Sequence, residues 1–358
     1  MPTEKEVLAA LSTVMDPELN VSLVQAGMVK GIRVDAGRIF ATIELTTPAC
    51  PLKGKIQADA EAALKSLPGV SGLELSWTSQ VRGQAQAAGM LPGVKNIILV
   101  GAGKGGVGKS TVAVNLAVAL AKHGATVGLL DADFYGPSIP MMTGLSDQRP
   151  VSPDGKRLEP LEALGIKVMS LGFLVEPDQA LIWRGPMLHG ALQQLMRDVN
   201  WGALDYLVMD LPPGTGDVAL TVSQSIRAAG AVLVTTPQDV ALADVVRAKH
   251  MFDKVQIPVL GIVENMSQFV CPHCGKSTPI FNHGGGRRAA ELFGVPFLGE
   301  IPLQLAVRVG GDEGRPIVAS APDSAEAQAF LSVARAVAGR VSVANGARAP
   351  AAAVTAAS

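Results

Sequence analysis

The sequence predicts an α/β protein with a mainly parallel sheet and helices on both faces, preceded by a small α/β domain. Apolar runs alternate with helical segments over most of the chain. These runs are continuous rather than alternating, which is typical of strands buried on both faces. A glycine-rich segment also separates the first run from a helical segment. The runs are "NIILVG", "TVGLLD", "IKVMSL", "DYLVMD", "AVLVTT" and "VLGIVEN".

The small domain is expected over residues 1–78. Apolar residues first recur at helical spacing and then alternate as in half-buried strands. Residues 79–93, "SQVRGQAQAAGMLPG", are polar and aperiodic, which indicates a linker. The second domain is expected over 94–340, and the Ala-rich tail 341–358 is expected to be disordered. The periodic residues are Val7, Leu8, Leu11 and Val14 for the helix, and Ile39, Ala41, Ile43, Leu45, Leu73, Leu75 and Trp77 for the strands.

Bulk composition limits the class of protein. The chain has 358 residues, is 48% hydrophobic and carries a formal net charge of −1. A neutral chain argues against a broad nucleic-acid footprint, so no nucleic-acid partner is expected. The sequence contains no apolar run of 18 or more residues, so no membrane helix is predicted. The first residues, "MPTEKEVLAAL", lack the apolar segment of a signal peptide. We therefore expect a cytoplasmic protein without a membrane partner. In that reducing compartment a close cysteine pair favours metal binding or reactivity over a disulfide.

The segment "GKGGVGKS", Gly103 to Ser110, fits the phosphate-binding motif G-x-x-x-x-G-K-[ST] and follows a predicted strand. The motif predicts a P-loop NTPase. Lys109 is expected to reach the β- and γ-phosphates of ATP, and the Ser110 hydroxyl to bind Mg²⁺. The full set expected to bind ATP in this segment is Gly103, Lys104, Gly105, Gly106, Val107, Gly108, Lys109, Ser110 and Thr111.

Acidic residues end two of the predicted strands. Asp210 closes "LVMD" in a Walker-B pattern and is expected to hold the Mg²⁺ shell. "DLPPGTGD" follows it and is expected to sense the γ-phosphate. "LLDADFYGPS" places Asp131 and Asp133 at another strand end. We expect Asp133 to orient the attacking water, with Asp131 as the second candidate.

Lys104 is an additional lysine five residues before Lys109. Two interpretations are open: a solvated loop lysine, or a lysine that neutralises charge at a partner subunit's nucleotide as an arginine finger does. The segment "KGGVGKST" resembles the deviant Walker-A ATPases of the SIMIBI branch of P-loop proteins. That resemblance implies a homodimer in which the first lysine acts catalytically across the interface.

Cys271 and Cys274 form a single C-x₂-C in "FVCPHCGKSTPIF". Such a pair is half of a four-thiolate site, and half a zinc ribbon, a redox pair or a structural turn remain alternatives. The chain has no second pair. A twofold dimer would supply four thiolates, enough for one [4Fe–4S] cluster.

Motifs across residues 90–320 resemble the Mrp/ApbC family, among them "DADFYGPSIP", "DLPPGTGD", "TTPQDVALADV", "GIVENMSQFVCPHC" and "GVPFLGEIPL". The resemblance implies an ATP-hydrolysing carrier that takes a [4Fe–4S] cluster from a donor and passes it to apo iron–sulfur proteins. It also implies that Asn265 reads the adenine edge. The alternative is a partition or positioning ATPase with a structural zinc at its dimer interface.

The N-terminal segments "DPELNVSLVQAGMV" and "TTPACPL" resemble the iron–sulfur-assembly domain fused to bacterial Mrp proteins. Cys50 precedes a helix start, which is expected to lower its thiol pKa and favour ligation, although an inert buried thiol is also possible. Asp16 and Glu18 are either site residues or an N-cap and a first-turn acid. His273 is a candidate ligand or a solvated residue, and His283 is expected to lie in a structural turn.

Overall fold

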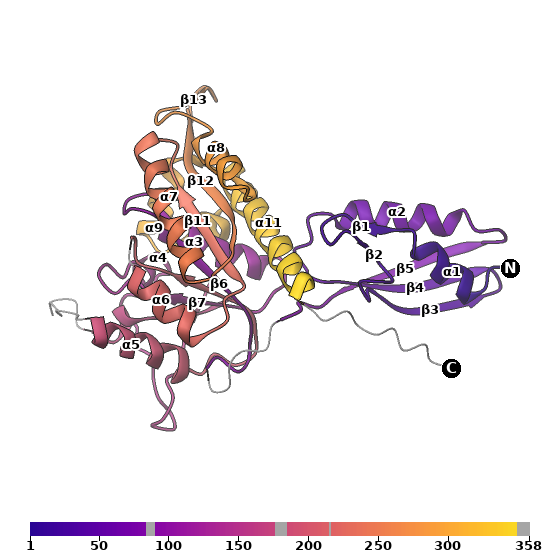
Figure 1. Cartoon of the computed structure of the whole chain (residues 1–358), viewed down its shortest axis with the longest axis horizontal. Helices are drawn as coiled ribbons and strands as arrows, with labels where there is room; N and C mark the ends of the chain where they lie inside the picture. The colour runs from indigo at the N-terminus through magenta and orange to yellow at the C-terminus, as the bar shows by residue number, and fades with distance from the viewer. Residues whose placement is uncertain (84–89, 176–184, 215, 349–358) are drawn as a thin grey trace. The chain divides into compact units, whose positions relative to one another are not determined.

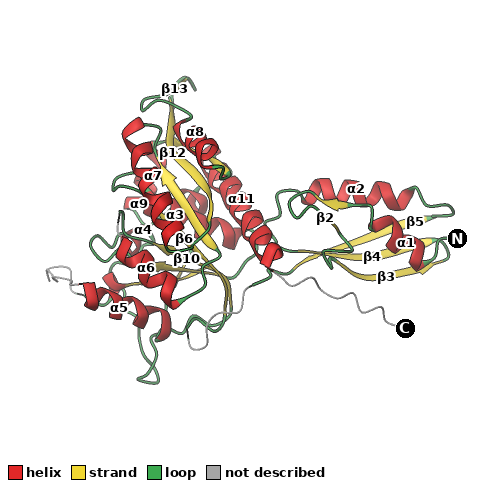
Figure 2. Ribbon diagram, viewed as in Figure 1, coloured by secondary structure: helices red, strands yellow, loops and turns green. Residues whose placement is uncertain are grey.

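The computed structural model describes residues 1–83, 90–175, 185–214 and 216–348, which form two compact units (Figure 1). One unit comprises Met1–Arg82 together with the described residues from Ala338 onward. The other comprises Gly83–Val337. Figure 2 shows that both units mix helices and strands, as the sequence predicted.

The N-terminal unit contains a three-stranded sheet in the order β3-β4-β5, with β3 antiparallel and β5 parallel to β4. The predicted alternation is confirmed in β4, where Ile39, Ala41 and Ile43 are buried. A capping box between Thr3 and Glu6 begins the first helix. The elements are α1 (Glu4–Leu11), β1 (Met15–Asp16), β2 (Val21–Ser22), β3 (Val29–Asp35), β4 (Arg38–Leu45), α2 (Lys53–Lys65) and β5 (Gly72–Ser79).

The second unit is built on a nine-stranded sheet within the described residues, in the order β13-β12-β11-β6-β10-β7-β9-β8, with β14 also paired to β12. The pairings are parallel except for those of β8 and β13 at the margins. The fold class predicted from the continuous apolar runs is therefore confirmed. The strands are β6 (Val94–Gly101), β7 (Val127–Asp131), β8 (Leu161–Ala163), β9 (Ile166–Ser170), β10 (Leu204–Asp210), β11 (Gly230–Thr235), β12 (Val259–Val270), β13 (Ser277–Thr278) and β14 (Phe297–Leu303).

The helices of this unit fall into two groups by their contacts. Helix α3 contacts α4 and α10, whereas α5 packs on α6 and α7 packs on α8. Crossovers that run in opposite directions along a parallel sheet place their right-handed connections on opposite faces, so the two groups cover the two faces. The helices are α3 (Lys109–Lys122), α4 (Ile139–Met142), the 3₁₀ turn η1 (Leu171–Phe173), α5 (Gly185–Arg197), α6 (Gly216–Ser225), α7 (Asp239–Lys254), α8 (Gly285–Phe293), α9 (Leu305–Asp312), α10 (Ile317–Ser320) and α11 (Ala325–Arg348).

The expectation of a disordered tail from residue 341 is wrong for residues 341–348, because α11 continues to Arg348. Two contacts within the N-terminal unit stabilise this last part of the helix. Val341 is buried, and the Ser342 hydroxyl donates a hydrogen bond to Thr46 Oγ1 at 2.7 Å. Alanine, which made the segment look featureless, is also the best helix former. Residues 349–358 lie outside the described residues.

Helix α1 offers a matched test of the small core. Leu11 is fully buried, whereas Leu8 is 40% exposed. Leu11→Ala is expected to cost about 2–5 kcal/mol of unfolding free energy because it leaves a cavity. Leu8→Ala is expected to cost well under half as much. Hydrogen exchange of peptides from residues 1–82 in the full chain measures both, and equal effects would contradict this core.

Candidate functional site

Three neighbouring strands bring the predicted nucleotide-binding residues together. Strands β6, β10 and β7 are parallel, so their carboxyl ends meet at one edge of the sheet. Asp210 is paired with Val100 on one side and with Asp131 on the other. Loops that follow parallel strands form the ligand crevice in open α/β sheets. This edge is therefore the candidate nucleotide site.

The phosphate loop, Gly103–Ser110, leaves β6 and opens α3. Gly106 and Gly108 have φ values of +81° and +79°, a left-handed conformation that favours glycine. A Cβ at Gly108 would lie 2.2 Å from Asn265 Nδ2, so a larger residue there would displace the Asn265 side chain. At Gly106 a Cβ would meet nothing within 4 Å. The loop is thus packed behind and open in front, as a phosphate cradle requires.

Lys109 lies at the centre of the site. Its side chain is only 6% exposed, and its ammonium is 2.6 Å from Asp210 Oδ1 and 3.6 Å from Asp133 Oδ2. The same Nζ donates to Ser110 Oγ at 3.1 Å. The first turn of α3, the end of β10 and the loop after β7 therefore meet around one cation. The predicted residues Lys109, Ser110, Asp133 and Asp210 are brought together.

Asp210 and Asp131 are two buried carboxylates on adjacent strands. Burial raises the pKa of Asp210, while the Lys109 ammonium opposes that shift. Burial and the neighbouring Asp210 raise the pKa of Asp131. Among the described residues, Asp210 Oδ2 is buried without a hydrogen-bond partner. That oxygen is a ready acceptor for a ligand at this edge.

Asp131 and Asp133 have different environments. Asp131 Oδ1 accepts the Asp133 backbone N–H at 3.0 Å, and its Oδ2 accepts the Ser170 hydroxyl at 2.9 Å. Both carboxylate oxygens of the buried Asp131 therefore accept hydrogen bonds from the protein, whereas the Asp133 carboxylate faces Lys109. Ser170, at the end of β9, had no sequence motif to mark it.

Lys104 and Asn265 differ in how they are held near the phosphate loop. Lys104 is half-buried, and no hydrogen bond or ion pair ties it to another residue in the described part of the chain. Asn265 Nδ2 donates to Val107 O at 2.9 Å, so its amide supports the loop backbone. The expected contact of Asn265 with adenine remains a prediction. Thr215 of the "DLPPGTGD" segment lies outside the described residues, and Gly214 N donates to Ala102 O at 3.2 Å.

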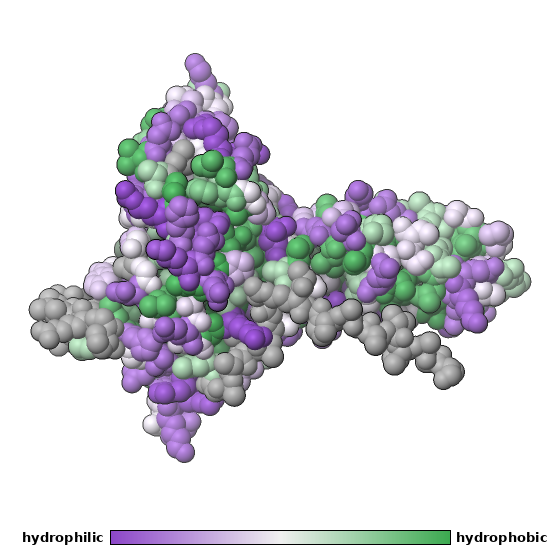
Figure 3. All heavy atoms as spheres, viewed as in Figure 1, coloured by the Kyte–Doolittle hydropathy of each residue, from purple (hydrophilic) through white to green (hydrophobic). Residues whose placement is uncertain are grey.

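The cysteine pair lies in the turn of an antiparallel hairpin formed by β12 and β13. Cys271 N donates to Lys276 O at 3.0 Å, and Gly275 N donates to Cys271 O at 2.9 Å, which closes a tight knuckle. The backbone N–H groups of Cys274 and His273 lower the pKa of the Cys271 thiol. Figure 1 shows that the hairpin projects from its unit, and hydrophilic residues gather at this end in Figure 3. Of the two free thiols, Cys274 is exposed and Cys271 is half-buried.

The N-terminal cysteine differs from its expected character. Burial raises the pKa of Cys50 to about 11, although the backbone N–H groups of Leu52 and Lys53 act in the opposite direction. The predicted lowering by a helix start is therefore wrong, because desolvation outweighs it. Glu18 and Asp16 add further negative charge near the thiol.

Asp16 does not cap a helix, contrary to one of the two expectations. Its Oδ1 accepts the backbone N–H groups of Glu18 and Leu19 at 2.8 and 3.1 Å in the turn between β1 and β2. Burial raises the pKa of Glu18. The two acids therefore belong to a turn rather than to the first turn of a helix.

The structural turn expected at His283 is confirmed. The N-terminus of α8, where a phosphate would bind, is instead capped by the carboxylate of Glu264. Glu264 accepts Gly284 N at 3.1 Å and Gly286 N at 2.6 Å. Sequence reasoning missed Glu264, although a charged residue inside the apolar run "VLGIVEN" was the available signal.

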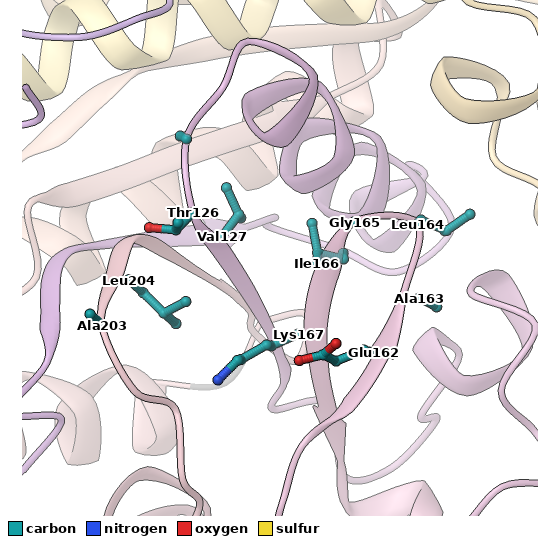
Figure 4. Close-up of a pocket in the computed structure, with 11 residues that line it drawn as sticks. Thr126, Val127, Glu162, Ala163, Leu164, Gly165, Ile166, Lys167, Ala203 and Leu204 are labelled. Carbon is teal, nitrogen blue, oxygen red and sulfur yellow. The ribbon is translucent and has the colours of Figure 1, made fainter. Parts of the chain in front are cut away.

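A pocket of about 510 Å³ lies at the amino ends of the parallel strands, the end opposite the candidate nucleotide site (Figure 4). It is lined by the starts of β7 and β10 and by the β8–β9 turn. Lys167 in its wall donates to Trp201 O at 3.1 Å. Because parallel strands run from this edge toward Asp131 and Asp210, the pocket is separate from the nucleotide site.

Comparison with known proteins identifies both units. The family described as "NUBPL iron-transfer P-loop NTPase" matches residues 93–338, and "iron-sulfur cluster assembly protein" matches residues 4–75. An "iron-sulfur cluster carrier protein" of Deinococcus radiodurans is 51% identical over 94% of this chain and 95% of its own. The protein of that name from Synechocystis is 51% identical over 96% and 99%.

Solved structures extend the likeness to a nucleotide complex. A nucleotide-binding protein from Archaeoglobus fulgidus in complex with ADP is 44% identical, with a TM-score of 0.56, and covers 63% of this chain and 89% of its own. The cell-division ATPase MinD of Pyrococcus furiosus is 25% identical, with a TM-score of 0.51, over 68% and 98%. None of the described helices is both long and apolar enough to span a membrane.

The pH dependence of cysteine alkylation tests the opposite pKa shifts of Cys271 and Cys50. A lowered pKa gives Cys271 more thiolate at a given pH, so its alkylation by iodoacetamide should begin below the ordinary thiol range. Cys50, with a pKa of about 11, should be roughly 0.1% thiolate at pH 8 and react last. Peptide mass spectrometry of the full chain over pH 6–10 measures this order. In urea the three rates should converge, and equal rates for Cys50 and Cys271 in the folded protein would contradict it.

Proposed function

The chain belongs to the family of NUBPL iron-transfer P-loop NTPases, and on that premise we propose that it is an ATP-dependent carrier of iron–sulfur clusters. It takes a cluster from a donor and passes it to apo iron–sulfur proteins. The full-length relatives named as iron–sulfur cluster carriers support this assignment. We place the activity in the cytoplasm, where a reducing environment keeps thiols free to bind iron.

The observation that carries the proposal is the exposed hairpin with its single thiol pair. Backbone N–H groups lower the pKa of the Cys271 thiol, which favours the thiolate, the form that binds iron. The sequence holds three cysteines, and the third, Cys50, is partly buried with a raised pKa. A [4Fe–4S] cluster needs four thiolates. We therefore propose that two copies of the chain pair as a homodimer and hold one cluster between their Cys271–Cys274 pairs.

The nucleotide chemistry follows from the edge of the sheet. Lys109 would bind the β- and γ-phosphates of ATP in the open face of the phosphate loop. The residues fit Mg²⁺, because the orphaned Asp210 Oδ2 and the Ser110 hydroxyl supply the oxygens that this ion prefers. An Mg²⁺ ion held by these two residues would supply positive charge to neutralise the phosphates. Asp133, beside Lys109, would orient the attacking water.

Lys104 would complete the site of the partner subunit. It is half-buried and without an ion pair among the described residues, so its charge is free for another molecule. A lysine on the partner's γ-phosphate would stabilise the transition state in the way that an arginine finger does. This arrangement would couple hydrolysis to dimer geometry, and so to the cluster held between the cysteine pairs.

The alternative function is a partition or positioning ATPase with structural zinc between the cysteine pairs. The MinD likeness favours it at the level of fold. A nucleic-acid partner is not part of our proposal, because the formal net charge is only −1. We propose no membrane partner either. Metal analysis distinguishes the two functions.

Cluster loading is the first test. Anaerobic reconstitution of the full chain with iron and sulfide should give absorbance near 400 nm and about four irons per dimer. The Cys271→Ala/Cys274→Ala variant should bind no cluster yet retain ATP binding, since the phosphate loop is on another element. Cys50→Ala is the control and should load normally. A full cluster in the double variant would refute the bridging site, and zinc without any reconstituted cluster would support the alternative.

Subunit mixing tests Lys104. Lys104→Ala should retain ATP binding but hydrolyse ATP at least about 10³-fold more slowly, the scale of a lost finger residue. Lys109→Ala should lose productive ATP binding. A one-to-one mixture should recover up to about a quarter of the wild-type rate, because mixed twofold dimers contain one intact composite site. A rate no higher than that of the two parents would contradict action across the interface.

A further inference from the structure

Three side chains of metal-ligating type meet beside α8, and none of them belongs to the proposed nucleotide or cluster ligands. Glu264 and Glu300 are paired residues on the parallel strands β12 and β14, and His283 lies just before α8. One ligand atom from each of the three lies within 4.8 Å of the other two. His283 Nε2 is 2.7 Å from Glu300 Oε2. Two strands and the loop before α8 thus bring three potential ligand atoms close enough together to contact one metal ion.

We propose that Glu264, His283 and Glu300 form a binding site for a divalent first-row metal ion, such as Fe²⁺ or Zn²⁺. One imidazole nitrogen and two carboxylate oxygens are a ligand set that these ions accept. The set contains no thiolate, so it suits a single ion rather than an iron–sulfur cluster. Three protein ligands leave the remaining coordination positions to water.

The ligands are held in place by groups outside the set. Both carboxylate oxygens of Glu264, which is fully buried, accept backbone N–H groups of Gly284 and Gly286. Each carboxylate oxygen keeps a second lone pair for an ion. Asn282 Oδ1 accepts the His283 backbone N–H at 2.9 Å. The two bonds to Glu264 fix its carboxylate, as outer hydrogen bonds do for the ligands of natural metal sites, and the bond from Asn282 fixes the backbone at His283.

Local charge favours a cation at this position. Two carboxylates on adjacent strands repel each other. In the described ranges no lysine or arginine forms an ion pair with either one. Arg287 lies over the Phe297 ring, and Arg288 pairs with Asp239 at 3.9 Å and donates to the His283 carbonyl oxygen at 3.2 Å. The imidazole of His283 contacts Glu300 at 2.7 Å. A divalent ion would neutralise the pair. Capping of α8 explains how Glu264 is oriented, but it does not explain why His283 and Glu300 are gathered next to it.

Cobalt titration tests the proposal without nucleotide or cluster. The full chain carrying Cys271→Ala and Cys274→Ala, freed of metal with a chelator, is titrated with Co²⁺ and followed by its visible d–d absorption. We expect one Co²⁺ per chain. His283→Ala and Glu300→Gln should each weaken binding by more than about tenfold, since even outer partners of a metal site contribute that much. Their side chains are 47% and 37% exposed, so both variants should fold.

Matched variants complete the experiment. His273→Ala and Glu291→Gln remove an exposed histidine and an exposed α8 carboxylate and should leave Co²⁺ binding unchanged. Zn²⁺ should raise the melting temperature of the parent but not of His283→Ala or Glu300→Gln. Absence of binding in the parent, or undiminished binding in either of these two variants, would overturn the proposal. Because the thiols are removed, this result is independent of cluster loading.

Discussion

The buried ion pair between Lys109 and Asp210 holds the nucleotide edge together. The two charges are 2.6 Å apart, and neither is more than 6% exposed. Taking both from water is costly, and only close geometry repays it. That geometry exists because β6 and β10 are parallel neighbours, so the phosphate loop and the Walker-B strand end at the same level.

Strand β12 links the different parts of the P-loop NTPase unit. Its residue Glu264 caps α8, the next residue, Asn265, supports the phosphate loop, and Cys271 follows its last residue. Its pairing with β14 shifts register between Asn265 and Phe269, where Met266 has φ +55°. The strand therefore changes course between the part that serves the nucleotide and the part that presents the thiols.

Short sequence motifs predicted the parts of the site whose chemistry depends on residues close together in the chain. The phosphate loop, the strand-ending acids and the cysteine knuckle were found because each needs fixed residue types at fixed spacing. The error at Cys50 arose because neighbouring residues indicate a helix start but not how deeply the thiol is buried. Likewise, Ser170 and Glu300 could not be predicted, because their roles depend on which strands become neighbours. Residues 341–348 looked like a tail until tertiary contacts were known.

The N-terminal unit is built from two segments of the chain, which limits where the chain can be cut into fragments that fold alone. Residues 1–82 and the end of α11 form one compact unit although they lie at opposite ends of the sequence. In chain order, the residues of the P-loop NTPase unit are an insertion within the smaller domain. Asn345 Nδ2, for example, donates to Arg82 O at 2.9 Å, closing that unit across the inserted segment. A fragment cut at residue 82 would therefore lose part of its own packing, and covalent linkage of the two terminal segments would be needed to preserve it.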